Sequence, residues 1–249
     1  MKGAIASALP PVVLLHGWGG SSGSTWVRPG WVDDLRARGR EVTAIDLPGH
    51  GASKAPHDPA YYAEIVEIVE SQLPQAPVLD VVGFSLGGKL AILLALGDPG
   101  IFRNLVVAGV GENIFSREQG GELLAAVLRD GITDDCPAPL RDMVVYVWQS
   151  GNDPEAILAC LTRPWTPPTP EQITGLSTSI LLAAAAADPV AGSLDPLAAC
   201  LPNAEVIRLD GVDHLSTPYS RQLRVSALDF LSAESTASYQ PVAPGELEL

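Results

Sequence analysis

The sequence predicts an α/β fold with a mostly parallel β-sheet and helices on both of its faces. Short apolar runs alternate with stretches of helical periodicity along most of the chain, which is typical of repeated strand–helix units. A Gly-x-Ser-x-Gly segment also lies where one such run passes into a helical stretch. The length of 249 residues is enough to bury a sizeable core within one domain.

The expected elements follow one another in strand–helix order. Strands are predicted from short apolar runs at residues 11–15, 41–46, 78–83, 104–109, 178–184 and 204–209. Helices are predicted between and after them, at residues 31–38, 60–73, 86–97, 193–200 and 218–232.

Residues 112–175 interrupt this alternation after the fourth predicted strand. Three helical segments are predicted within them, at residues 113–130, 140–149 and 153–161, before a proline-rich return to the core. An insertion at this point would lie, as a lid, over the serine of the Gly-x-Ser-x-Gly segment. The predicted core is formed by residues 1–111 and 176–233, and residues 112–175 form the lid between its two parts. Residues 234–249 are predicted to be a flexible tail.

The serine motif Gly83-Phe84-Ser85-Leu86-Gly87 predicts a nucleophile. A serine on a sharp strand-to-helix turn has strained backbone geometry, and glycines two residues before and after it avoid steric clashes. Its hydroxyl is then held at a helix N-terminus, where developing negative charge is favoured. The alternative is that Ser85 only caps the helix.

A base and an acid are expected from the later strands. His214 follows an apolar strand and a glycine, and Asp188 ends the apolar run at residues 180–187. Both lie just past predicted carboxyl ends of strands, the edge at which open α/β sheets hold their ligands. We expect His214 to be the general base and Asp188 to orient it. Other acids left open for that role are Asp195, Asp210 and Asp213.

The remaining histidines have less direct interpretations. His16 and His50 are expected to hold loops near the site by hydrogen bonds rather than to act in catalysis. His57 lies between prolines and is expected to be a solvated loop residue.

Three further segments complete a recognisable pattern. They are His16-Gly17-Trp18-Gly19-Gly20 after the first strand, Asp46-Leu47-Pro48-Gly49-His50-Gly51-Ala52-Ser53 after the second, and Gly211-Val212-Asp213-His214. Together with the serine motif and Asp188, the chain resembles the lid-bearing esterases and lipases of the α/β-hydrolase superfamily over residues 10–232. The resemblance implies the α/β-hydrolase fold and a triad in the chain order Ser85, Asp188, His214.

The chain departs from this family at its beginning. The family has two antiparallel strands before the first motif, whereas only eleven residues precede Val12. We expect the leading hairpin to be missing and the exposed sheet edge to be covered, with a homodimer as one way of covering it.

An oxyanion hole is expected beside the serine. Two main-chain N–H groups would stabilise the charge that develops on an attacked carbonyl oxygen. One is the N–H of Leu86, the residue after the nucleophile, and the resemblance assigns the other to Trp18.

Apolar side chains on the inner face of the lid would shape the substrate pocket. The predicted substrate-binding residues are Trp18, Phe115, Val144 and Trp148, with Leu123 and Val147 as further candidates. The alternative is that the lid residues only pack the lid against the core.

The predicted reaction is hydrolysis of a carboxylic ester, or a related acyl bond, of a small to medium substrate through an acyl-enzyme. It requires no metal and no organic cofactor. Serine rather than aspartate at the turn argues against dehalogenase and epoxide hydrolase chemistry. Two alternatives remain: a C–C lyase of the menaquinone-pathway type, which needs a basic pocket, and a small-molecule-binding signalling protein with little turnover. The basic residues of the lid are Arg117, Arg129, Arg141 and Arg163.

Composition excludes some partners. A net charge of −14 and an isoelectric point near 4.5 argue against binding to nucleic acid or an anionic membrane surface. No uninterrupted apolar run is long enough to span a bilayer, and no signal peptide is predicted. The three cysteines are scattered, which is typical of buried thiols in a reducing compartment and predicts a cytoplasmic protein.

Overall fold

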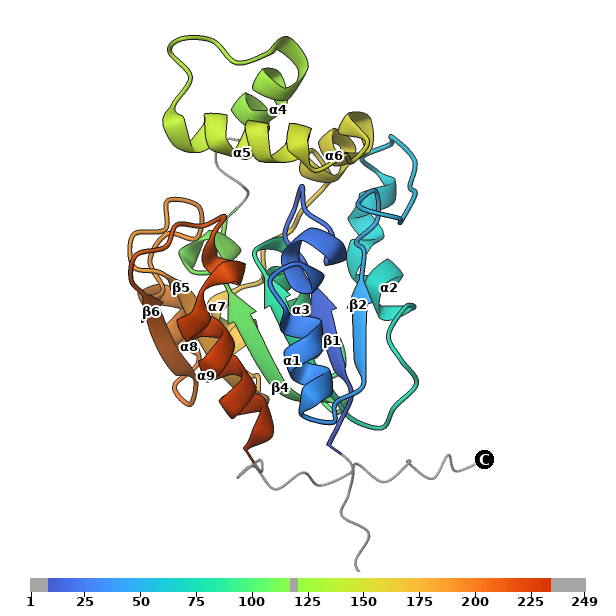
Figure 1. The fold of residues 1–249 in the computed structure, drawn as a ribbon, viewed down its shortest axis with the longest axis vertical. Coiled ribbons are helices and arrows are strands. Elements are labelled where there is room, and N and C mark those ends of the chain that lie inside the picture. Colours follow the sequence, from blue (N-terminus) through green and yellow to red (C-terminus); the bar gives the residue numbers. More distant parts are fainter. Residues whose placement is uncertain (1–8, 117–120, 234–249) are drawn as a thin grey trace, which may run out of the picture.

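The computed structural model describes residues 9–116 and 121–233 (Figure 1). They contain one six-stranded parallel sheet in the order β2-β1-β3-β4-β5-β6. All six predicted strands are confirmed, with ends that differ by one or two residues. Their bounds are β1 Val12–Leu15, β2 Val42–Ile45, β3 Leu79–Phe84, β4 Phe102–Ala108, β5 Ser179–Ala185 and β6 Glu205–Leu209.

The order of the strands reverses at β1. The chain passes from β1 outward to β2, then crosses back to β3 and continues outward to β6. β1 and β3 are neighbours whose carboxyl ends lie side by side, with Leu15 paired to Gly83. The loops that follow these two strands therefore start together and run in opposite directions along the sheet edge. In parallel α/β sheets a crevice opens at such a reversal, and ligands bind there.

Helices cover both faces of the sheet (Figure 1). Alternate strand residues point to opposite faces, so that Val13 and Leu15 join one core cluster while Val12 and Leu14 join the other. The first cluster lies under α2 Ile65–Glu70, α3 Leu86–Gly97, α7 Pro170–Thr174 and α8 Asp195–Cys200. The second lies under α1 Trp31–Ala37 and α9 Arg221–Ser232. The inner strands β1, β3, β4 and β5 are largely buried on both faces and are mostly apolar in sequence, whereas the edge strands β2 and β6 are partly exposed.

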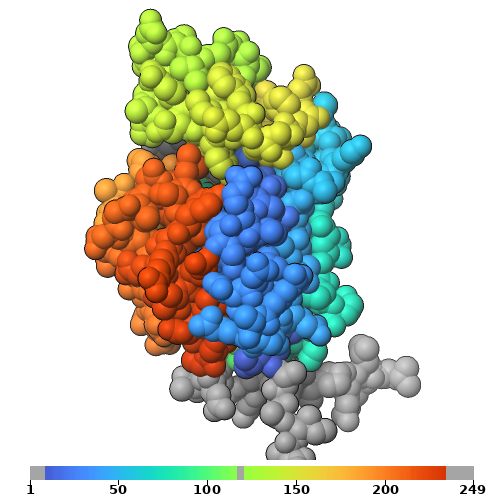
Figure 2. Space-filling model, viewed as in Figure 1, coloured from blue at the N-terminus to red at the C-terminus, as the bar shows by residue number. Residues whose placement is uncertain are grey.

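Three helices form a separate layer over the carboxyl ends of the strands (Figures 1 and 2). They are α4 Gly121–Asp130, α5 Ala138–Gln149 and α6 Pro154–Leu161, and we call them the α4–α6 layer. α4 packs against both other helices, and Val127, Cys136 and Val144 form a small apolar cluster within the layer.

The structure adds two elements that we did not predict. A π-helical turn, Gly23–Val27, follows the loop after β1. Helix α7 begins with a capping box, in which Thr169 Oγ1 accepts from Gln172 N–H at 3.3 Å and Gln172 Oε1 accepts from Thr169 N–H at 2.8 Å. Threonine followed three residues later by glutamine is a helix-start pattern that the sequence contained.

Some predicted helices are shorter in the structure. The stretch at 60–73 divides into a 3-10 helix, Tyr61–Glu64, and α2, and the stretch at 218–232 divides into the short turn Thr217–Tyr219 and α9. Among the described helices, none combines the length and apolar character that a bilayer span needs. The missing hairpin and the flexible tail concern mainly residues 1–8 and 234–249, which lie outside the described residues.

A buried ion network closes the end of the sheet opposite the serine. Asp80, the second residue of β3, is fully buried and pairs with both Arg40 and Arg103. The Nε of Arg103 donates to Asp80 Oδ1 at 2.9 Å. Both arginines also donate to the Leu231 carbonyl, at 3.1 and 2.9 Å, so the network connects β3 and β4 to the end of α9. Burial lowers the pKa of Arg40, and the ion pair with Asp80 opposes that shift.

Asp80→Ala should destabilise the fold by about 3–5 kcal/mol, because it leaves two guanidinium groups without their buried partner. Asp229→Ala is the matched control, since Asp229 pairs with Arg38 at 3.6 Å on the exposed surface and such pairs contribute little. Denaturant unfolding of both variants measures the difference. Equal destabilisation by the two substitutions would mean that the network does not support the fold as described.

Candidate active site

Ser85 lies on the turn between β3 and α3 with φ 52° and ψ −115°. It is the only non-glycine residue with positive φ in the part of the chain that the structure describes. A Cβ on Gly83 would collide with the Gly87 carbonyl, and a Cβ on Gly87 would collide with the Leu15 carbonyl. The Gly-x-Ser-x-Gly spacing therefore has a steric cause, and the strain holds the serine hydroxyl above the sheet edge.

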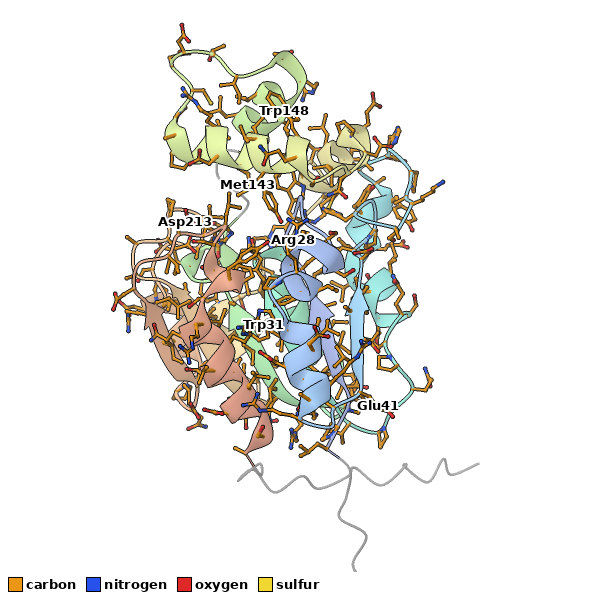
Figure 3. All side chains as sticks on the ribbon, in the orientation of Figure 1. Arg28, Trp31, Glu41, Met143, Trp148 and Asp213 are labelled. Carbon is orange, nitrogen blue, oxygen red and sulfur yellow. The ribbon has the colours of Figure 1, made fainter. Side chains whose placement is uncertain are left out.

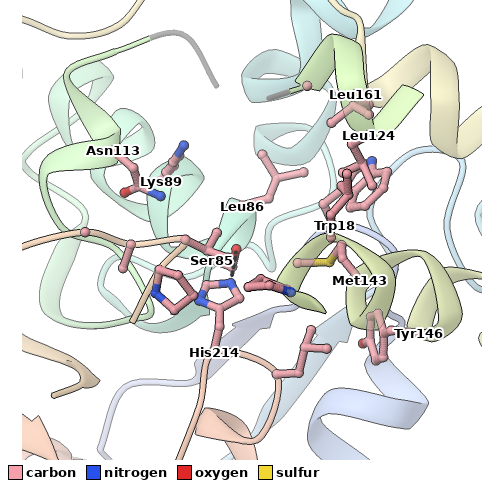
Figure 4. Close-up of a pocket in the computed structure, with 18 of the residues that line it drawn as sticks. Trp18, Ser85, Leu86, Lys89, Asn113, Leu124, Met143, Tyr146, Leu161 and His214 are labelled. Carbon is pink, nitrogen blue, oxygen red and sulfur yellow. Dashed lines mark hydrogen bonds between the residues drawn. The ribbon is translucent and has the colours of Figure 1, made fainter. Parts of the chain in front are cut away.

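His214 contacts both Ser85 and Asp188, and Figure 4 shows its ring beside Ser85. Its Nε2 is 3.0 Å from Ser85 Oγ, and its Nδ1 is 2.8 Å from Asp188 Oδ2. Nδ1–H donating to the carboxylate leaves the Nε2 lone pair to accept the serine hydroxyl proton. The loops after β3, β5 and β6 thus bring together residues far apart in the sequence.

Asp188 is held as a carboxylate. Burial acts to raise the pKa of Asp188. This effect is outweighed by the hydrogen bond from His214, by the charge of His214 and by two main-chain N–H groups, so the pKa of Asp188 lies below its usual value. Those N–H groups belong to Val190 and Ala191, and each donates to Oδ1 at 2.9 Å. Both oxygens of the carboxylate are therefore engaged.

The other acids that the sequence left open face elsewhere. Asp213 Oδ1 accepts from the N–H and hydroxyl of Ser216, at 2.8 and 2.6 Å. Asp195 pairs with Arg208 on the exposed surface, and Asp210 is itself exposed. Of the acids considered, Asp188 is the one that contacts the His214 ring.

The two expected oxyanion donors lie close to the serine. Leu86 begins α3, Trp18 follows β1, and both line the cavity beside Ser85. Among the hydrogen bonds of the described residues, none uses the main-chain N–H of Trp18 or Leu86. Gly17 lets the loop after β1 lie close to the serine turn, because a Cβ at this position would come within 2.9 Å of the Phe84 ring.

The remaining histidines contact loops rather than the cavity. His16 Nδ1 donates to the Gly17 carbonyl at 2.8 Å, and its Nε2 accepts from Leu47 N–H at 3.0 Å. Burial lowers the pKa of His16 to about 4 and that of His50 to about 3, so both rings are neutral at pH 7. His57 is half exposed, as expected of a loop residue, and it also pairs with Asp153 of the α4–α6 layer at 2.8 Å.

A cavity of about 830 Å³ lies between the sheet edge and the α4–α6 layer. Figure 4 shows polar side chains near Ser85 on one side and apolar side chains on the other. The polar lining includes Lys89, Glu112, Asn113 and His214. The apolar lining includes Trp18, Leu124, Leu140, Met143 and Leu161. Within the described residues, no cluster of three or more His, Cys, Asp or Glu side chains is arranged to hold a metal ion.

The predicted substrate-binding residues divide into two groups. Trp18 lines the cavity, whereas Phe115 packs against the main core and Val144 is buried between α4 and α5. Trp148 is 50% exposed and lies on the side of α5 turned away from the sheet, while Met143 lies on the side that faces it (Figure 3). Phe115, Val144 and Trp148 do not line the cavity.

Residues that the sequence analysis missed shape the cavity from α4 and α5. They are Leu124, Leu140, Met143 and Tyr146, and the further candidate Leu123 joins them. Leu140, Met143 and Tyr146 are spaced three residues apart, so they follow one side of α5. That spacing was visible, but Val144 and Val147 offered an equally apolar side.

Comparison with known protein families gives a match to the family model described as "alpha/beta hydrolase fold" over residues 10–129. The matched region includes Trp18 and Ser85 and ends before Asp188 and His214. Among solved structures, a carboxylesterase of Nitrososphaera gargenis is 18% identical, with a TM-score of 0.71 over 90% of each chain. The enol-lactonase of Burkholderia xenovorans LB400 is 20% identical, with a TM-score of 0.68 over 93% of this chain and 94% of the lactonase. These likenesses show a shared fold.

Curated relatives are esterases and lipases by name. The pimeloyl-[acyl-carrier protein] methyl ester esterase of Nitrosomonas europaea is 41% identical over 100 residues, 39% of this chain and 36% of the relative. The enzyme of that name from Methylococcus capsulatus is 33% identical over 66% of this chain and 63% of its own length. The sn-1-specific diacylglycerol lipase ABHD11 of Mus musculus is 36% identical over 42% of this chain and 34% of its own length. The chain spans less than two thirds of each of these relatives.

Proposed function

We propose that this chain is an α/β-hydrolase that hydrolyses carboxylic esters of small to medium substrates with Ser85 as nucleophile. The observation that carries the proposal is the hydrogen-bonded chain from Ser85 Oγ through His214 to Asp188. Ser85 and His214 line the cavity, beside the two main-chain N–H groups of Trp18 and Leu86. The names of the curated relatives support the same reaction class.

The proposed reaction begins with attack by Ser85 Oγ on the ester carbonyl carbon. The hydroxyl proton passes to His214 Nε2, and Asp188 keeps Nδ1–H directed and stabilises the imidazolium. The N–H groups of Trp18 and Leu86 donate to the carbonyl oxygen as it becomes negative. The C–O bond to the alcohol then breaks, and the leaving alkoxide takes the proton from His214. Water attacks the resulting acyl-enzyme, His214 again accepts the proton, and Ser85 is regenerated with release of the acid.

The cavity supports a substrate with two unlike ends. Its volume of about 830 Å³ is within the range of sites for drug-sized ligands. Apolar side chains of the α4–α6 layer would receive a hydrocarbon portion, while Lys89 and Asn113 lie where a polar portion would reach. In this proposal the layer acts as the lid of the site, and residues 112–175 form the lid segment.

The cavity lining does not favour the lyase alternative. A multiply anionic substrate needs several cations, and Lys89 is the one lysine or arginine among the described residues that line the cavity, where Glu112 accompanies it. Arg129, Arg141 and Arg163 are not part of that lining, and Arg117 lies outside the described residues.

Two measurements test the proposed function together. A fluorophosphonate probe should label the protein stoichiometrically, and a p-nitrophenyl ester should be turned over many times per labelled site. Labelling without turnover would favour the binding-protein alternative, and no labelling would contradict a serine nucleophile. A series of acyl and alcohol lengths would then define the substrate class.

The value of kcat/KM should rise through mildly acidic pH and level off near neutral pH. A histidine accepts the serine proton only when it is neutral, and imidazoles ordinarily titrate near pH 6.5. His16 and His50 should add no step between pH 5 and 8, because their pKa values are lowered to about 4 and about 3.

The control for this pH profile is a measurement of the fraction of protein that is folded at each pH. Since His16 and His50 take up protons in the unfolded chain before they do so in the folded one, stability should fall as pH drops from about 6.5 toward their lowered pKa values. Rates are therefore normalised to folded protein at each pH. A flat normalised profile from pH 5 to 8 would count against a histidine base.

A further inference from the structure

The turn between α5 and α6 holds two loops of the core through a single side chain, Asn152. Its Nδ2 donates to the carbonyls of Gly19 and Gly20, each at 2.9 Å. Its Oδ1 accepts from Gly51 N–H at 2.7 Å. The amide uses both of its N–H bonds and its carbonyl, so a side chain from the α4–α6 layer joins the loop after β1 to the loop after β2.

Asn152 is itself held firmly in the turn. Its main-chain N–H donates to Ser150 Oγ at 3.2 Å, and that hydroxyl donates to the Val147 carbonyl at the end of α5 at 2.6 Å. The next residue, Asp153, caps the start of α6 by accepting from Glu155 N–H at 3.0 Å. The side chain is therefore presented from the junction of two helix ends rather than from a long free loop.

The loop after β1 also packs directly on the layer. Trp18 Nε1 donates to the Ile157 carbonyl of α6 at 3.0 Å. A Cβ on Gly19 would come within 2.8 Å of Val147, and a Cβ on Gly20 within 2.6 Å of the Tyr146 hydroxyl. In Figure 1 this loop rises from β1 to the junction of α5 and α6. The loop that carries Trp18 N–H is thus positioned by the α4–α6 layer as well as by the sheet.

Asp46, at the end of β2, connects the loop after β1 to the loop after β2 from the side of the core, as Asn152 does from the α4–α6 layer. Its Oδ1 accepts from Ser22 N–H at 2.7 Å, and its Oδ2 accepts from Ala52 N–H at 2.8 Å. It therefore joins the same two loops beneath the point where Asn152 joins them. With both ties in place, the backbone around Trp18 is held from below and from above.

We propose that Asn152 is a positioning residue for the oxyanion hole: it fixes the carbonyls of Gly19 and Gly20 and thereby aims the N–H of Trp18 at the reacting carbonyl. The inference rests on the proposed function. An oxyanion donor stabilises the transition state only at hydrogen-bond distance from the charge that develops, so a small displacement of this loop lowers the rate. Asn152 does not touch substrate in this account, and it acts through the loop.

Asn152→Asp is the sharpest test. It keeps the size of the side chain and an acceptor for Gly51 N–H, but it replaces the Nδ2–H donors with an oxygen that faces two carbonyls. We expect kcat per fluorophosphonate-titrated site to fall on the order of 10- to 100-fold on a p-nitrophenyl ester. We expect KM to change much less, because the cavity lining is intact. Asn152→Ala should give a similar loss without the added charge.

Asn203→Asp is the matched control, since Asn203 is exposed on the turn between α8 and β6, at the amino end of β6 and therefore at the sheet edge opposite the serine. It makes the same chemical change and should leave kcat unaltered. An alkyl boronic acid, which forms a tetrahedral adduct with the serine, should bind Asn152→Asp more weakly in parallel with the loss of kcat. The pH profile should stay in place, because His214 and Asp188 are untouched.

Amide hydrogen exchange at Gly20 gives a readout that does not depend on turnover. The Gly20 N–H donates to the Gly17 carbonyl at 3.1 Å, so its exchange should quicken in Asn152→Ala and not in Asn203→Asp. Wild-type kcat per titrated site in both Asn152 variants, or a loss explained by the unfolded fraction alone, would overturn the inference while leaving the proposed function intact. A wild-type protein that neither reacts with the probe nor hydrolyses the ester would overturn both.

Discussion

Ser85→Ala should lower ester turnover by roughly 10⁴-fold or more while the protein stays folded. The substitution removes the attacking oxygen and the proton that His214 Nε2 would accept across 3.0 Å. The strain at φ 52° is the same for alanine as for serine, since both carry a Cβ, so the melting temperature should change little. Saturating p-nitrophenyl ester kinetics and mass spectrometry of the phosphonylated protein measure the two effects.

The control for this substitution is another serine of the same cavity. Ser116 lines the cavity, and His214 makes its hydrogen bonds to Ser85 and Asp188. Ser116→Ala should therefore keep stoichiometric labelling and most of the turnover. Near-wild-type turnover in Ser85→Ala would show that the nucleophile is a different group.

Asp188→Asn should lower kcat/KM by a factor on the order of 10² to 10⁴. An amide retains an oxygen for the N–H groups of Val190 and Ala191, but it no longer offers a charged acceptor to His214 Nδ1. The imidazole then loses both its fixed tautomer and the charge that offsets the imidazolium. Rates per folded molecule, measured over the neutral plateau of the pH profile, give the size of the loss.

Asp213→Asn provides the matched comparison, because Asp213 is the immediate sequence neighbour of His214 and is bound to Ser216 instead. It should lose far less activity than Asp188→Asn. The opposite ranking would assign the orienting carboxylate to the histidine loop.

The local chain was sufficient to predict the strands and the strained turn that carries Ser85. The inner strands of this parallel sheet are covered on both faces, so each is a largely apolar run that can be recognised without knowing its neighbours. The turn at Ser85 is local at its first glycine, since the groups that exclude a side chain at Gly83 come from Gly87 and Gly88, whereas those that exclude one at Gly87 come from the end of β1. A strained turn of this kind leaves its pattern within five consecutive residues, Gly83 to Gly87.

The choice among the candidate acids required the tertiary structure. Asp188, Asp195, Asp210 and Asp213 all lie near the ends of the last two strands, and their residue type does not separate them. Tertiary structure does, because a carboxylate can orient His214 only from hydrogen-bond distance of Nδ1. Asp188 is 2.8 Å from that atom, while Asp195 is turned to Arg208 and Asp213 to Ser216.

The sequence by itself determined the sheet and the serine turn, because these depend on burial and backbone strain within short segments. Only the tertiary structure decided which side of α5 faces the cavity and which residues join the α4–α6 layer to the core. Val144 and Met143 are neighbours on an apolar helix, and their roles differ because α4 packs on one side of α5 and the sheet edge lies on the other. Asn152 has no local pattern at all, since its three partners come from loops about a hundred residues or more earlier in the chain.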